Sequence, residues 1–238
     1  MNKNIEILKL TIKYITQASN KISPLVLTRY APHSKTAPND LDVLTKKSAF
    51  RQIVNFFTDI GYHTKSHDNA LGGRIKGAQL NIIKQDRIKI DLHKDFTWRK
   101  KRYFDLKLVW SNLVKKEIVG NQILTPKTEL DAFIVLVNVI FEKSYIVQQD
   151  YKVLDNNLNI IFKNKMYLQQ AERYGWILTF TSFRRWWESD GKKLESFPAF
   201  LPFGFIMISY FEKFDLISFF YYFFFKARYL LNKTLPYE

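Results

Sequence analysis

Two aspartates lie one residue apart inside an apolar run, Asn39-Asp40-Leu41-Asp42-Val43-Leu44. In a β-strand, residues i and i+2 point to the same face, so Asp40 and Asp42 are expected to project together while Leu41 and Val43 enter a core. Neighbouring carboxylates repel each other unless a proton or a cation lies between them. A hard divalent cation such as Mg²⁺ prefers oxygen ligands and suits such a pair. The alternative is an exposed strand with two solvated aspartates.

A second strand is predicted by the strict alternation of Ile88-Lys89-Ile90-Asp91-Leu92-His93. Its apolar residues mark one face, and Lys89, Asp91 and His93 mark the other. A polar turn at residues 85–87 joins it to an extended segment at residues 80–84, which predicts a β-hairpin. If this hairpin lies beside the first strand, Asp91 joins the aspartate pair. Three carboxylates on one face of a sheet can hold one or two metal ions.

Helices and short strands surround these two segments. Helices are predicted at residues 5–18 and 48–60, the second ending at Gly61, a residue type common just past a helix C-terminus. A short strand is expected at residues 24–28, and another at residues 119–126 that leads into a helical region. Together these elements predict an α+β fold.

The aspartate pair, the later carboxylate and the order of these elements resemble the nucleotidyltransferase-like superfamily, in particular its uncharacterised minimal branch, over roughly residues 1–155. Asp40, Asp42 and Asp91 match the carboxylates of that family's motif. The resemblance implies a small mixed sheet flanked by helices. It also implies catalysis and metal binding by these three residues, with Mg²⁺ or Mn²⁺, and transfer of a nucleoside monophosphate from an NTP to an acceptor.

The sequence departs from that family where nucleotide phosphates are held. The family carries a Gly-Ser pair before the first aspartates, whereas residues 1–60 contain no glycine. Arg29, Ser34 and Lys35 in the corresponding stretch, together with Lys89, are expected to bind nucleotide phosphates through their side chains instead. The alternative is a protein that keeps the fold without catalysis and binds nucleic acid or another protein.

Charge and cysteine content limit the classes of partner and compartment. The 37 basic and 22 acidic residues give a net charge of +15, and such a field attracts RNA and other polyanions. Basic residues gather at residues 94–116 and 163–193. The chain has no cysteine, which excludes disulfides and thiolate metal sites and fits a cytoplasmic protein.

The composition changes near residue 122, which predicts two domains at residues 1–122 and 123–238. Thr125 and Pro126 have the residue types of a helix N-cap and first turn, and a helix is expected at residues 129–142. Asp155-Asn156-Asn157 predicts a turn, followed by a helix at residues 158–174 that stops at Gly175. The second domain is therefore expected to be mainly helical.

Aromatic residues concentrate at the C-terminus. Residues 197–238 hold 16 of the 39 aromatic residues, and Leu216–Phe225 carries no charge. Phe197–Phe211 is almost wholly apolar, but neither run reaches the roughly 18 residues of a membrane-spanning helix. Burial against the first domain, or in a homodimer interface, is preferred to membrane contact.

Overall fold

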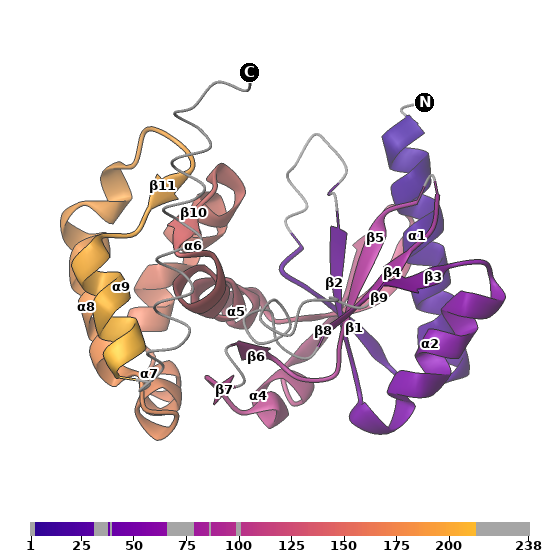
Figure 1. Cartoon of the computed structure of the whole chain (residues 1–238), viewed down its shortest axis with the longest axis horizontal. Coiled ribbons are helices and arrows are strands. Elements are labelled where there is room, and N and C mark those ends of the chain that lie inside the picture. Colours follow the sequence, from indigo (N-terminus) through magenta and orange to yellow (C-terminus); the bar gives the residue numbers. More distant parts are fainter. Residues whose placement is uncertain are drawn as a thin grey trace, which may run out of the picture.

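The computed structural model describes residues 3–30, 38, 40–65, 79–85, 87–98 and 101–212. A lobe built around a β-sheet stands beside a helical lobe (Figure 1). Both predicted features of the fold class, a mixed sheet flanked by helices and a mainly helical second part, are confirmed.

The main sheet has seven strands in the order β3-β4-β5-β2-β1-β9-β8. The β2–β5 and β1–β9 pairs are parallel, and the other neighbours are antiparallel. The predicted hairpin is confirmed, because β4 and β5 pair antiparallel and β5 lies directly beside β2. The strands are β1 Leu25–Thr28, β2 Asp40–Thr45, β3 His63–Lys65, β4 Gln79–Ile83, β5 Lys89–His93, β8 Leu113–Ile118 and β9 Asn121–Pro126.

The alternation of side chains along the strands gives the two faces of the sheet different roles. Leu41 and Val43 of β2 belong to a core cluster with residues of α1 (Lys3–Lys21) and α2 (Phe50–Asp59). These helices lie on one side of the sheet and α5 (Thr128–Asn138) on the other (Figure 1). The side chains of Asp40 and Asp42 therefore point away from α1 and α2, toward the side of the helical lobe. The polar residues of β5 point the same way.

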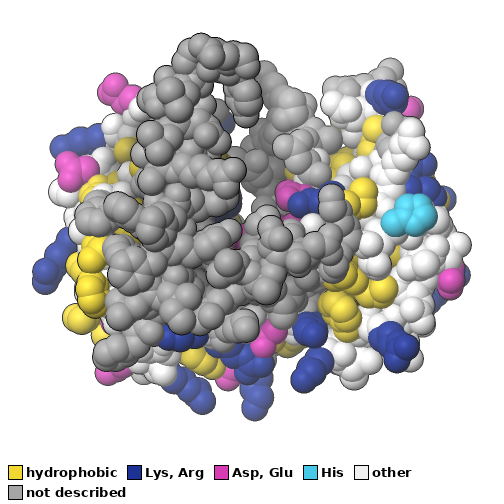
Figure 2. All heavy atoms as spheres, in the orientation of Figure 1, with side chains coloured by type: hydrophobic (Ala, Val, Ile, Leu, Met, Phe, Trp, Pro, Cys, Tyr) yellow, Lys and Arg dark blue, Asp and Glu magenta, His cyan; other side chains and the backbone are white. Residues whose placement is uncertain are grey.

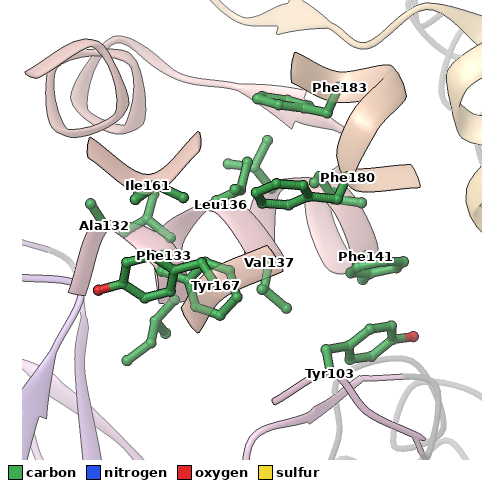
Figure 3. Packing of buried hydrophobic residues seen from close by; sticks show 14 of the residues in the cluster. Tyr103, Ala132, Phe133, Leu136, Val137, Phe141, Ile161, Tyr167, Phe180 and Phe183 are labelled. Atoms are coloured by element: carbon green, nitrogen blue, oxygen red, sulfur yellow. The ribbon is translucent and has the colours of Figure 1, made fainter. Parts of the chain in front are cut away.

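The helical lobe is built around α5, which is buried along almost its whole length. Its aromatic residues pack against later helices, as Figure 3 shows for Phe133 beside Tyr167, with ring centroids 4.6 Å apart. Tyr103 stacks on Phe141 at 3.9 Å. The remaining elements are η1 Lys47–Ala49, β6 Thr97–Trp98, β7 Lys101–Arg102, α4 Leu106–Trp110, the π-helix η2 Val139–Lys143, β10 Tyr145–Ile146, α6 Gln148–Lys163, α7 Lys165–Arg173, α8 Ile177–Ser189, η3 Gly191–Lys193, β11 Ala199–Phe200 and α9 Phe203–Phe211.

Three local predictions in the second half were wrong. Thr125 does not cap a helix, because it lies in β9 and Lys127 occupies the N-cap of α5. Asp155-Asn156-Asn157 lies within α6, where packing of Leu154 and Leu158 overrides the local turn preference. The helix expected at residues 158–174 is divided between α6 and α7, because Asn164 accepts the N–H of Met166 and caps a new helix.

The expected domain division stays a prediction. The sheet continues past residue 122, since β9 runs to Pro126 and pairs with both β8 and β1. Leu216–Phe225 lies outside the described residues. Among the helices that the structure describes, none is both long and apolar enough to cross a bilayer.

Candidate functional site

The pairing of β2 with β5 brings the three predicted aspartates to one region of the sheet. Asp42 and Asp91 are direct register partners on these parallel strands, and Asp40 lies opposite Lys89. Because the register is parallel and in phase, the polar residues of both strands project from the same face. Two segments about fifty residues apart in sequence thus form a single polar surface.

Lys89 lies between two of the carboxylates. Its Nζ is 3.0 Å from Asp40 Oδ2 and 3.1 Å from Asp91 Oδ2. Asp40 is the more open of the two, with 45% of its side chain exposed, whereas the Asp91 side chain is 8% exposed. Two carboxylates therefore converge on one cation at the accessible end of the site.

Asp42 is held by two other groups. Arg29 Nη2 donates to Asp42 Oδ1, and His93 Nε2 lies 3.0 Å from the same oxygen. Burial raises the pKa of Asp42, but the Arg29 charge and the His93 hydrogen bond outweigh it and lower the pKa to about 2. Asp42 is consequently ionised throughout the physiological pH range.

Asp91 differs from Asp42 although the two lie side by side. Burial raises the pKa of Asp91, the nearby Asp42 and Asp40 charges add to the rise, and Lys89 opposes it. Its Oδ1 is buried and has no hydrogen-bond partner among the described residues. A buried acceptor of this kind is costly, so the atom is suited to a proton or a cation.

Arg29 connects the sheet to the helical lobe. It follows β1 directly and has a φ of 57°, a left-handed conformation that is uncommon for residues other than glycine. Its backbone N–H donates to Asp131 Oδ1 at 2.7 Å, and its Nη1 lies 3.9 Å from Glu142 Oε2. Asn138 Nδ2 in turn donates to Glu142 Oε2. Contacts of both its backbone N–H and its guanidinium therefore hold Arg29 in this strained conformation.

Asp131 is a site residue that the sequence analysis missed. It lies in the first turn of α5, and the parallel pairing of β1 with β9 brings that turn beside Arg29. Burial raises the pKa of Asp131 to about 7, although the Arg29 N–H and the Lys116 charge act in the opposite direction. An acidic residue near the start of a predicted helix was its only signal in the sequence, and the partner is 102 positions away.

The predicted phosphate-binding residues divide into two groups. Arg29 and Lys89 lie within the carboxylate cluster, and both pair with aspartates. Ser34 and Lys35 lie outside the described residues. Within the described ranges, no three or more His, Asp or Glu side chains form a group that could hold a metal ion.

The comparisons with known proteins address the same strands. Residues 35–142 match the family model described as an uncharacterised nucleotidyltransferase, and the match includes all three aspartates. This part of the chain is nucleotidyltransferase-like. No curated protein matches the chain. The solved antibiotic-resistance factor ANT(2'')-Ia is similar at 10% identity, covering 76% of this chain and 95% of that chain with a TM-score of 0.43.

Removing Arg29 should destabilise the nucleotidyltransferase-like region, because the Asp42 carboxylate then loses its ion-pair partner. Arg29→Met retains an apolar stem, and we expect it to lower the free energy of unfolding by about 2 kcal/mol, because a largely buried carboxylate loses its main partner. Adding Asp42→Asn should restore more than half of that loss. Urea denaturation measures both effects.

Arg184→Met, which breaks an exposed pair with Glu188, is the control and should cost less than about 0.5 kcal/mol. Strictly additive losses in the double variant would contradict the coupling.

Asp131 should make stability fall with rising pH. Its pKa is raised to about 7 from 3.8, so the folded state binds the proton more tightly than the unfolded chain does. The resulting stabilisation is complete below pH 3.8 and is lost as the pH rises through 7. Asp131→Asn keeps an acceptor for the Arg29 N–H and should reduce this fall. Denaturation at pH 5, 6, 7 and 8 tests it, with Asp155→Asn on the exposed side of α6 as the control. Identical pH profiles for wild type and Asp131→Asn would refute the assignment.

Proposed function

We propose that the protein transfers a nucleoside monophosphate from an NTP to an acceptor hydroxyl at the carboxylate cluster of β2 and β5. The main support is one observation, the in-register pairing of Asp42 with Asp91, which puts three carboxylates on one polar face. The nucleotidyltransferase match over residues 35–142 supports the same reaction class.

The residues present fit a divalent metal bound together with substrate. Mg²⁺ is usually held by one or two carboxylates plus substrate phosphates, so a complete cage of protein ligands is not required. Asp40 and Asp91 converge on the Lys89 ammonium, and within the described ranges Asp91 Oδ1 has no hydrogen-bond partner. These two carboxylates would hold the ion together with substrate phosphates, with Asp42 beside them, since the three aspartates alone do not form a metal group in the described part of the chain. A bound ion would stabilise negative charge on the attacking and leaving oxygens.

The protein's own groups have distinct parts in the proposed step. The acceptor oxygen forms a bond to the α-phosphorus while the bond from that phosphorus to the bridging oxygen breaks, and pyrophosphate leaves. The acceptor proton goes to Asp91, whose carboxylate also helps to hold the ion. His93 and Arg29 keep Asp42 ionised and fixed in orientation.

In this proposal, cationic side chains bind the nucleotide phosphates in place of the family's Gly-Ser pair. Lys89, once released from Asp40 and Asp91, would neutralise phosphate charge. Arg29 has a buried Nε without a hydrogen-bond partner among the described residues, which leaves a donor available for a phosphate oxygen. Ser34 and Lys35 would supply further contacts from the segment that precedes β2.

Incubation with each of the four α-³²P-labelled NTPs, Mg²⁺ or Mn²⁺, and a panel of RNA, protein and small-molecule acceptors tests the reaction. We expect label transfer that EDTA abolishes. Asp40→Asn plus Asp42→Asn should reduce it by at least about a hundredfold, as removal of preorganised charged groups commonly does. Asp59→Asn, an exposed aspartate at the end of α2, is the matched control and should retain wild-type transfer. Transfer that survives the double substitution would rule out this site.

A second candidate function is binding without catalysis. It is favoured by the pairing of Arg29 and Lys89 with all three aspartates, which offsets two of their three negative charges, and by the net charge of +15. This candidate predicts salt-sensitive binding of nucleic acid with no detectable NTP binding. The labelled NTPs therefore separate the two functions in one set of experiments.

A further inference from the structure

A second polar pocket lies at the opposite end of β2 and β5 from Asp40. Because the two strands are parallel, the residues that follow both of them emerge at the same edge of the sheet. The pocket there has a volume of about 310 Å³, close to the lower limit for small-molecule sites. It is lined by Thr45, Lys46, Lys47, Lys94, Asp95, Thr97, Arg102, Leu106 and Trp110.

The pocket has an excess of positive charge. Lys46, Lys47 and Lys94 are exposed, and none forms an ion pair with a carboxylate in the described part of the chain. Arg102 neutralises the one lining carboxylate, with its Nε 2.7 Å from Asp95 Oδ2. Lys and Arg side chains gather along the lower edge of the molecule in Figure 2, where Figure 1 places β6, β7 and α4. Three ammonium groups that no described carboxylate neutralises surround one concavity, and this arrangement favours an anion.

A buried hydroxyl provides an independent sign of a polar ligand. Thr45 is the last residue of β2, is fully buried and lines the pocket. Its Oγ1 has no hydrogen-bond partner among the residues that the structure describes. A threonine hydroxyl can donate one hydrogen bond, and buried polar groups seldom go without a partner.

An apolar wall restricts the shape of the ligand. Leu106 and Trp110 come from α4, and Lys46 Nζ lies 5.9 Å from the centre of the Trp110 ring. An amphipathic ligand can place its charge near the lysines and its body against this wall. The small volume fits a compact molecule better than a polymer backbone.

We propose that this pocket binds a small phosphorylated molecule with an aromatic or apolar body. The phosphate is recognised by Lys46, Lys47, Lys94 and the Thr45 hydroxyl, since ammonium groups make strong charge-assisted hydrogen bonds to phosphate oxygens. The body packs against Leu106 and Trp110. This site is separate from the carboxylate cluster and does not depend on the proposed nucleotidyl transfer.

Isothermal titration of the full chain with phenyl phosphate, and with inorganic phosphate for comparison, tests the site. Phenyl phosphate is expected to bind more tightly because it also contacts the apolar wall. Lys46→Gln plus Lys47→Gln should weaken its binding about tenfold or more. Thr45→Val, which keeps the side-chain shape, should weaken it about threefold or more. The matched control is Lys9→Gln plus Lys13→Gln, which removes the same charge from the exposed side of α1.

Every result of these titrations either supports or overturns the proposed site. Equal weakening in the two double-lysine variants, or inorganic phosphate binding as tightly as phenyl phosphate, would overturn the proposal. So would a ten-nucleotide single-stranded RNA that binds more tightly than phenyl phosphate and depends on Lys46 and Lys47. Asp42→Asn should leave phenyl phosphate binding unchanged, so failure of nucleotidyl transfer and failure of this site can be told apart.

Discussion

The ion pair between Arg29 and Asp42 is the contact on which the site depends. Asp42 stays ionised in a largely buried position because Arg29 and His93 compensate the cost of burial. The same arginine reaches the helical lobe through Asp131 and Glu142, and it does so from a left-handed backbone conformation. One residue directly after β1 therefore keeps Asp42 ionised and links the sheet to α5 and to Glu142.

The two ends of the β2–β5 strand pair have opposite electrostatic character. At one end, carboxylates outnumber the single ammonium of Lys89 that they share. At the other, lysines that have no carboxylate partner in the described part of the chain surround a pocket with an apolar wall. Both arise from the same parallel pairing, which aligns the beginnings of the two strands on one side and their ends on the other. The strand pair thus presents one end suited to cations and one suited to anions.

The sequence predicted the parts of the site that depend on short-range periodicity. The alternation in residues 88–93 identified the face shared by Lys89, Asp91 and His93, and the Asp40–Asp42 spacing identified the partner strand. Contacts across long separations, such as Arg29 with Asp131, depend on strand order and left no local signal. The same limit explains the turn expected at Asp155-Asn156-Asn157, where packing of α6 against α5 outweighs the local preference of three polar residues.

The most direct test of the central claim is the linkage between metal and nucleotide binding. Calorimetry of each NTP with wild type should show tighter binding in Mn²⁺ than in EDTA. Asp91→Asn should lose that enhancement, whereas Asp59→Asn should retain it. An NTP affinity that is the same with and without Mn²⁺, or an enhancement that persists in Asp91→Asn, would contradict a nucleotide-metal site at the carboxylates of β2 and β5.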